Sequence, residues 1–147
     1  EAIIRHGIRD NIDWASHGFE FAGEAGDGEY AYPLILKAQP DILVTDIKMP
    51  FMDGLELSRL VKKTLPRTRI IVLSGYNEFE YAKEAIRIEV EEYILKPIDA
   101  GELQELFGRI KKSLDKEIDE KRNIDKLQEY YMESLPLLQE NFFYLAF

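Results

Sequence analysis

The 147-residue sequence contains no cysteine, which excludes disulfide bonds and thiolate metal sites. Long apolar runs are also missing, because no stretch approaches the roughly 20 residues of a membrane-spanning helix. Basic residues are fewer than acidic ones, and the net charge of −9 argues against binding of nucleic-acid phosphates by this segment. We therefore expect a cytoplasmic protein that has no membrane segment and does not itself bind DNA.

Short aliphatic runs that alternate with helical patterns are what the sequence does contain. Such runs at residues 42–45, 70–73 and 93–95 predict strands, and Phe19-Glu20-Phe21-Ala22 at residues 19–22 is a further, short strand candidate. Five stretches with apolar residues at helical spacing lie around them, at residues 4–12, 31–38, 57–65, 79–90 and 103–110. This alternation favours the α/β class, with a parallel sheet that carries helices on both faces.

A polar side chain follows three of the predicted strands, namely Asp46, Ser74 and Lys96. Because the carboxyl ends of parallel strands meet at one edge of a sheet, we expect these side chains to converge there. A carboxylate, a hydroxyl and an ammonium group suit phosphoryl transfer to Asp46, whose carboxylate would attack phosphorus. Lys96 would neutralise phosphoryl oxygens and Ser74 would donate a hydrogen bond to one of them. A divalent cation would reduce the repulsion between the carboxylate and an anionic donor.

Three motifs surround these residues in a fixed order: TDIKMPFMDG at 45–54, VLSG at 72–75 and EEYILKPI at 91–98. With them, residues 1–112 resemble the receiver domain of two-component response regulators. The resemblance implies a flavodoxin-like, doubly wound parallel sheet with the strand order 2-1-3-4-5, and a cis peptide bond before Pro97. It also implies a phosphoryl acceptor rather than an enzyme that acts on other substrates, with a sensor histidine kinase as partner and Mg²⁺ as cofactor.

The same resemblance implies a role for each matching residue. Asp46 corresponds to the phosphoacceptor and to a metal ligand, Ser74 to the switch hydroxyl, and Lys96 to the lysine that binds the phosphoryl group. Tyr93 corresponds to the aromatic switch residue, and the backbone carbonyl of Lys48 to a magnesium ligand. Phosphorylation is expected to reposition Ser74 and Tyr93 and to favour a homodimer through the fourth helix, fifth strand and fifth helix of the family, together with the linker that follows.

A narrower resemblance connects NIDWASHGFEFAGEAGDG at 11–28 and SGYNEFEYAKEAI at 74–86 with receivers that precede AraC-type helix-turn-helix output domains. It implies a role in transcription regulation, with DNA bound only by an output domain that this sequence does not include. Residues 113–147 are expected to form a helical linker toward that domain. Their mixed charges and imperfect apolar repeat fit either a solvated helix extension or a signalling helix that pairs between protomers.

One part of the family pattern has no match in the sequence. Receivers begin with an aliphatic strand that ends in an acidic pair holding Mg²⁺, whereas this sequence opens at EAIIRHGI, where Glu1 corresponds to the residue after the pair. We expect the slot of that strand to be filled by residues before Glu1 or by a partner, because an empty slot would leave buried backbone groups without hydrogen bonds. Otherwise residues 19–22 should pair directly with residues 42–45. That second arrangement would suit a phosphorylation-independent pseudo-receiver that acts as a dimerisation or binding module.

Overall fold

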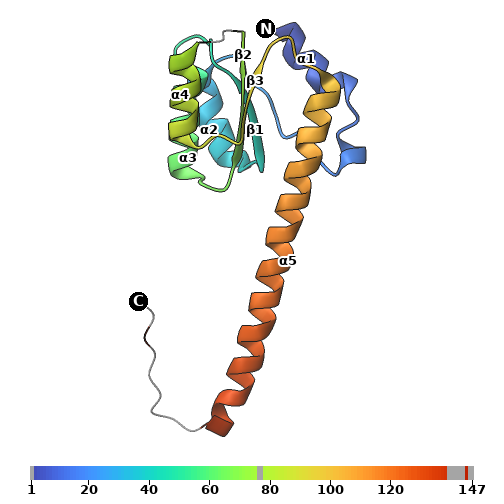
Figure 1. Cartoon of the computed structure of the whole chain (residues 1–147), viewed down its shortest axis with the longest axis vertical. Helices are drawn as coiled ribbons and strands as arrows, with labels where there is room; N and C mark the ends of the chain where they lie inside the picture. Colours follow the sequence, from blue (N-terminus) through green and yellow to red (C-terminus); the bar gives the residue numbers. More distant parts are fainter. Residues whose placement is uncertain (1, 76–77, 139–144, 146–147) are drawn as a thin grey trace. The chain divides into compact units, whose positions relative to one another are not determined.

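The computed structural model describes residues 2–75, 78–138 and 145 (Figure 1). Its helices are α1 (Ala2–Asn11), the 3-10 helix η1 (Ala15–His17), α2 (Gly28–Ala38), α3 (Gly54–Thr64), α4 (Phe79–Ile88) and α5 (Ala100–Leu138), and its strands are β1 (Ile42–Asp46), β2 (Arg69–Ser74) and β3 (Glu92–Leu95). The chain divides into two compact units, residues 1–107 and residues 108–147. The first unit contains the sheet, and the described part of the second is the continuation of α5 together with residue 145.

The sheet consists of three parallel strands in the order β1-β2-β3. The register pairs Asp46 with Leu73 and Ser74 with Leu95, so the three strands end at one edge. The central strand β2 is the most deeply buried, because helices cover it on both faces, and residues 70–72 have no exposed surface. The predicted strands at 42–45, 70–73 and 93–95 are therefore confirmed, together with the parallel α/β class.

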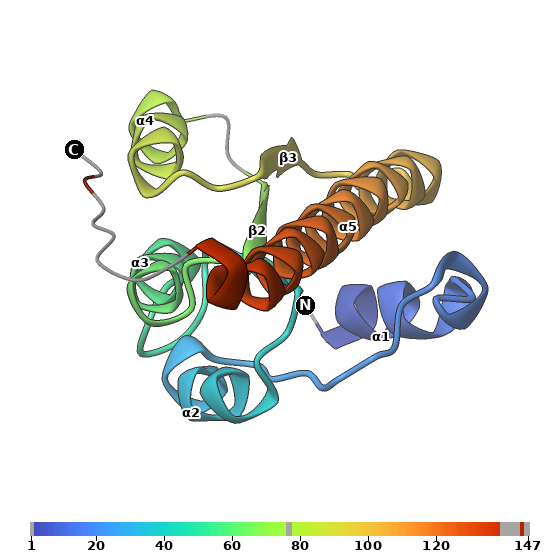
Figure 2. The ribbon, with the colours of Figure 1, turned by 90° about the horizontal axis from the view of Figure 1, so that it is seen from below.

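Helices cover both faces of the sheet in the first unit. Figure 1 and Figure 2 show α2, α3 and α4 on one face and α1 on the other. The spacing of apolar residues explains how α3 is placed, because Leu57 and Val61 lie one turn apart and are at most 1% exposed. The Asp53 side chain accepts a hydrogen bond from the Glu56 amide at 2.8 Å and so caps the start of α3. The core between this helix layer and the sheet is continuous.

A cluster of three aromatic side chains, Trp14, Phe19 and Phe107, lies at the end of α1. The indole Nε1 of Trp14 donates a hydrogen bond to the carbonyl of Ile8 at 3.0 Å. The centroid of its ring lies 4.5 Å from that of Phe107, and the Phe19 ring meets the same phenylalanine at 5.1 Å in an edge-on arrangement. These contacts anchor the turn after α1 and the segment that follows it.

The prediction of a strand at residues 19–22 is wrong. These residues are extended but unpaired, and the described sheet has three strands rather than the four expected from the sequence. A strand requires a neighbour for its ladder of hydrogen bonds, and β1 has only β2 beside it among the described strands. The direct pairing of residues 19–22 with residues 42–45 is therefore absent as well. Contacts of Phe19 with the aromatic cluster hold the segment instead.

The predicted helical extension is confirmed as far as Leu138, the last residue of α5 within the described range. Residues 139–144, 146 and 147, which belong to the expected linker, lie outside the described residues. The Lys96–Pro97 peptide bond, just before α5, is cis as the family resemblance implies.

Candidate functional site

Asp46 and Lys96 meet at the carboxyl edge of the sheet. Asp46 is the last residue of β1, and Lys96 follows the last residue of β3. The Lys96 Nζ lies 2.7 Å from Asp46 Oδ2, and both side chains are about four-fifths buried, with 19% and 18% of their surface exposed. The other carboxylate oxygen, Oδ1, accepts a hydrogen bond from the Ile47 amide at 2.9 Å. The carboxylate is thus held in one orientation, with a positive charge directly beside it.

Ser74 is at the end of β2, the strand that lies between β1, which ends at Asp46, and β3, which precedes Lys96. It is the neighbour of Leu73, which pairs with Asp46. Its carbonyl accepts a hydrogen bond from the Lys96 amide at 2.8 Å, and its side chain is fully buried. The strand ends therefore bring together all three residues that the sequence singled out.

Gly54 contributes to the site in a way that sequence reasoning missed. Its amide donates a hydrogen bond to the Ile47 carbonyl at 2.8 Å, which closes the loop between β1 and α3. A Cβ atom at this position would lie 1.8 Å from the carbonyl oxygen of Asp46, so only glycine fits. The Asp53-Gly54 pair in the sequence signals a turn, but the close approach to Asp46 depends on the packing of α3.

Lys48 lies two residues after the end of β1, and Tyr93 lies within β3. The Lys48 Nζ sits 5.7 Å from the centroid of the Tyr81 ring on α4, a cation–π contact that the sequence did not reveal. Tyr93 is opposite Val72 in the sheet and packs, half-buried, against the main core. The switch role of Tyr93 and the metal-ligand role of the Lys48 carbonyl stay predictions.

The described residues do not by themselves form a complete magnesium site. Within residues 2–75 and 78–138 no group of three or more histidine or acidic side chains is close enough to hold a metal ion. Asp46 is already paired with Lys96, whereas Mg²⁺ prefers six oxygen ligands, among which carboxylates, phosphates and water are usual. Glu1 lies outside the described residues.

A second polar cluster joins α1 to the segment that follows residue 22. Arg5 Nε donates a hydrogen bond to Glu24 at 2.9 Å, Arg9 forms an ion pair with the same carboxylate, and His6 Nε2 lies 3.8 Å from it. Desolvation alone would raise the pKa of Glu24, but the hydrogen bond from Arg5 and the charges of Arg9 and His6 together lower it. The cluster holds the extended segment against α1.

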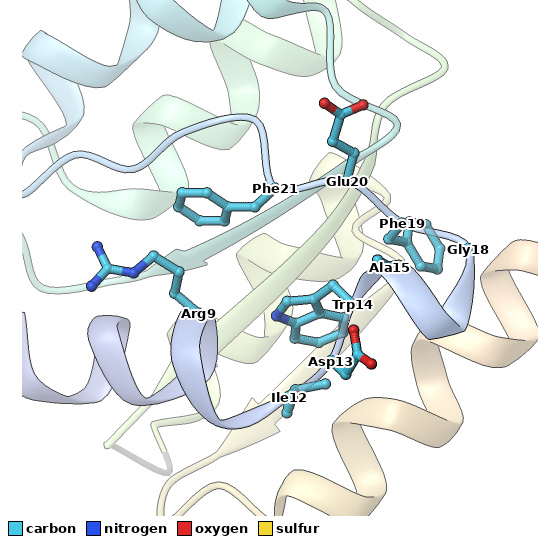
Figure 3. Close-up of a pocket in the computed structure, with 9 residues that line it drawn as sticks. All are labelled: Arg9, Ile12, Asp13, Trp14, Ala15, Gly18, Phe19, Glu20 and Phe21. Atoms are coloured by element: carbon cyan, nitrogen blue, oxygen red, sulfur yellow. The ribbon is translucent and has the colours of Figure 1, made fainter.

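An aromatic hollow of about 570 Å³ lies near the end of α1 (Figure 3). Its walls come from α1, η1 and the extended segment, and the residues that line it are Arg9, Ile12, Asp13, Trp14, Ala15, Gly18, Phe19, Glu20 and Phe21. None of the strand-end residues is among them, so the hollow is separate from the site at Asp46.

Within the part of the chain that the structure covers, no helix combines the length and the apolar character needed to cross a bilayer.

The comparison with known proteins agrees with this geometry. The family model described as "Response regulator receiver domain" matches residues 1–107. A transcriptional regulatory protein of Bacillus subtilis, YesN, which is described as uncharacterized, is 44% identical over 116 residues, which are 76% of this chain and 32% of the relative. The transcriptional regulatory protein HptR of Staphylococcus aureus is 38% identical over 114 residues, 78% of this chain and 44% of the relative. The chain thus spans less than half the length of these relatives.

Solved structures show the same fold. The REC domain of AraT, a response regulator from Geobacillus stearothermophilus, has a TM-score of 0.74 at 47% identity, covering 80% of this chain and 91% of that chain. A two-component transcriptional regulator AraC from Clostridium phytofermentans has a TM-score of 0.70 at 32% identity, covering 82% and 92%. The strand-end geometry, the family model and these relatives agree, and the chain belongs to the response regulator receiver domain family.

Proposed function

We propose that this receiver domain accepts a phosphoryl group on Asp46 from a sensor histidine kinase and thereby controls an output domain. The observation that carries the proposal is the contact between Lys96 Nζ and Asp46 Oδ2 at 2.7 Å, with Oδ1 held by the Ile47 amide. An oriented carboxylate beside a fixed ammonium group suits attack on a phosphoryl group, because the ammonium group can follow the charge as it moves onto phosphoryl oxygens.

The proposed transfer is a single displacement at phosphorus. A carboxylate oxygen of Asp46 forms the new oxygen–phosphorus bond, while the bond between phosphorus and the imidazole nitrogen of the donor histidine breaks. The electron pair of that bond stays on the imidazole, which then takes up a proton. Lys96 shifts from the carboxylate toward the phosphoryl oxygens, and the hydroxyl of Ser74 donates a hydrogen bond to one of them. The domain is then a phosphoryl acceptor rather than an enzyme that acts on other substrates.

Mg²⁺ remains the proposed cofactor, since receiver domains as a family bind it. The Asp46 carboxylate and the backbone carbonyl of Lys48 would be two of its ligands. The rest would come from outside the described residues, from water or from the phosphoryl group.

Mass spectrometry of the intact full-length protein, after incubation with acetyl phosphate and Mg²⁺, tests the assignment. The parent protein should gain the mass of one phosphoryl group, and Asp46→Asn should gain none. Asp41→Asn is the matched control, because Asp41 is exposed and precedes the opposite end of the same strand. Unchanged labelling of Asp46→Asn would place the acceptor elsewhere, and equal loss in both variants would show that the change in charge alone disturbs the reaction.

We further propose that phosphorylation repositions Ser74 and Tyr93 and favours a homodimer through α4, β3 and α5. Three large apolar side chains on α4 and β3 support this: Phe79 is 76% exposed, Ile86 77% and Leu95 44%. Phe79 and Ile86 are seven residues apart on α4 and so lie on one face of the helix. Large apolar side chains exposed on one helix face are suited to an interaction site.

The continuation of α5 supports pairing of the linkers between protomers. Several of its large apolar side chains are about half exposed or more, namely Ile118, Ile124, Leu127, Tyr130, Tyr131 and Met132. A helix that is surrounded by water on all sides is expected to carry mostly polar side chains. Sedimentation analysis of the full-length protein should show a dimer that Ile86→Glu and Leu127→Glu both weaken, whereas Tyr30→Glu, on α2, should leave it intact. A monomer at every concentration, with and without acetyl phosphate, would contradict the proposal.

The relatives named as transcriptional regulators support a role in transcription, with DNA bound by an output domain and not by the receiver. A cytoplasmic location fits that role.

The exposed apolar side chains of α4 and β3 would equally serve one alternative. In it, the chain is a pseudo-receiver that dimerises or binds a partner without phosphorylation. The two functions separate in the labelling experiment, since a pseudo-receiver would dimerise without any gain in mass.

A further inference from the structure

Phe51 is the feature of the site that the proposed chemistry does not use. It lies in the loop between β1 and α3, and 86% of its surface is exposed. Its backbone has a positive φ of 66°, in the left-handed region that residues with a Cβ atom adopt reluctantly. A solvent-facing position with this conformation normally carries glycine or asparagine.

The other non-glycine residues with positive φ in the described chain have a structural reason for it. Gln39 ends α2 at φ 48°, and Glu89 ends α4 at φ 65°. In both, the backbone amide closes the last turn of the helix through a hydrogen bond to a carbonyl, a common way for a helix to end. Phe51 ends no helix, so helix capping does not account for its conformation.

The loop around Phe51 is held at several points. The Met52 amide donates a hydrogen bond to the Pro50 carbonyl at 2.7 Å. The Gly54 amide donates another to the Ile47 carbonyl at 2.8 Å. Met52 packs against the core and also lies so close to Gly28 that a Cβ on that glycine would be 2.5 Å from the Met52 carbonyl oxygen. Because its neighbour Met52 packs inward, Phe51 is directed outward.

We infer that Phe51 is a contact residue for the protein that delivers the phosphoryl group to Asp46. The inference rests on the proposed function. The loop that carries Phe51 begins after Asp46 and ends at Gly54, which lies directly against the Asp46 carbonyl. Both ends of the loop are therefore next to Asp46, and Phe51 belongs to the surface that borders the site, which we call its rim. The Asp46 side chain is only 18% exposed, so a phosphohistidine must be brought deep into the site, and the protein surface around it must then meet the rim.

This geometry also specifies the chemistry of the partner. Phe51 carries no charge and presents an aromatic ring, which gains most when it enters an apolar pocket. The donor protein should therefore have an apolar patch beside its phosphohistidine. A small phosphodonor has no surrounding surface and would not touch Phe51.

The experiment compares two phosphodonors on the full-length protein. One is acetyl phosphate, and the other is an autophosphorylated histidine-kinase core, chosen in advance because it labels the parent protein. Phe51→Ala and Phe51→Gly should each slow transfer from the kinase core by about tenfold or more, where tenfold corresponds to roughly 1.4 kcal/mol, and should leave labelling by acetyl phosphate within about twofold. Phe51→Gly should melt at or above the temperature of the parent, because glycine accepts the positive φ. Tyr30→Ala is the control, since Tyr30 is an aromatic residue on α2 that is 63% exposed.

Each other outcome has a definite meaning. If both Phe51 variants accept from the kinase core at the parental rate while Asp46→Asn accepts from neither donor, the docking role is wrong and the proposed function stands. If labelling by acetyl phosphate falls equally, Phe51 shapes the site itself and the inference is overturned. If the variants change only the monomer–dimer equilibrium, a second copy of the chain is the occupant and the inference is again overturned. Labelling that survives Asp46→Asn would instead refute the proposed function.

Discussion

Replacing Gly54 by alanine would place a methyl group 1.8 Å from the carbonyl oxygen of Asp46 and 3.0 Å from Thr45 Oγ1. Ordinary van der Waals contact begins near 3.4 Å, so the strand end and the start of α3 must separate by more than about 1 Å. Two hydrogen bonds resist this movement. The Gly54 amide donates to Ile47 at 2.8 Å, and the Gly54 carbonyl accepts from the buried Ser58 hydroxyl at 2.6 Å.

The expected loss of stability follows from these contacts. Overpacking of a well-packed site costs about 1–3 kcal/mol, and each weakened buried hydrogen bond adds about 1 kcal/mol. We therefore expect Gly54→Ala to lower the free energy of unfolding by about 3 kcal/mol or more. For a domain of this size the melting temperature should fall by about 12 °C or more. Labelling of Asp46 should fall too, because its backbone is displaced.

Trp14 makes the measurement specific to the first unit. It is the only tryptophan in the sequence, and its ring packs against Phe107. Its fluorescence during urea denaturation therefore reports unfolding of residues 1–107, whereas far-ultraviolet circular dichroism would be dominated by the helices. Gly7→Ala in α1 is the matched control, because the nearest atom to its new Cβ would be 3.6 Å away. That variant should be as stable as the parent or more stable, by up to about 1 kcal/mol.

The outcome for Gly54→Ala can refute the reasoning directly. The free energy of unfolding could lie within about 0.5 kcal/mol of the parent value, with an unchanged slope against urea. That result would show that the end of β1 and the start of α3 can separate without loss of stability. The close approach of α3 to Asp46 would then not be a constraint on the site.

Three further predictions concern other contacts. Trp14→Ala should lower the free energy of unfolding by about 3–5 kcal/mol in urea, because the indole is buried and hydrogen-bonded; near-ultraviolet circular dichroism can follow this variant. Glu24→Gln should lower the melting temperature at pH 7. Arg5 and its neighbours lower the pKa of Glu24, so its stabilising contribution is complete above the ordinary pKa of about 4.3 and is lost as the pH falls through the lowered value; the two proteins should melt alike in stronger acid. In a double-mutant cycle, Tyr81→Leu and Lys48→Met should show a coupling of about 0.5–1 kcal/mol, whereas Tyr81→Phe should keep the contact.

The results that would contradict these predictions are equally specific. A Trp14→Ala protein as stable as the parent would show that the aromatic cluster does not anchor the turn after α1. A difference between Glu24→Gln and the parent that persists below the pKa of the carboxylate would assign the loss to packing and not to charge. A coupling of zero between positions 48 and 81 would mean that the ring and the ammonium group are merely adjacent.

Part of the fold could be predicted because its causes are local. The aliphatic runs at 42–45, 70–73 and 93–95 have the length and composition of strands buried on both faces, and each became a strand. The segment at 19–22 alternates aromatic and other side chains, which also suits a strand, but it did not become one. A strand depends on a neighbour that the segment itself cannot supply. Local pattern therefore predicted the wrong structure where pairing was decisive.

The candidate site divides in the same way. Asp46, Ser74 and Lys96 were identified from the sequence by itself, because a polar residue that follows a buried strand has a position set by the parallel sheet. The remaining details arise between segments that are distant in sequence or depend on how a loop packs. The sheet register and the conformation of Lys96 brought its Nζ within 2.7 Å of a carboxylate 50 residues earlier. Packing of α3 brought Gly54 against Asp46, and the fixed loop turned Phe51 outward with a positive φ. Only the tertiary structure decided these contacts, because each depends on backbone positions that no local sequence pattern determines.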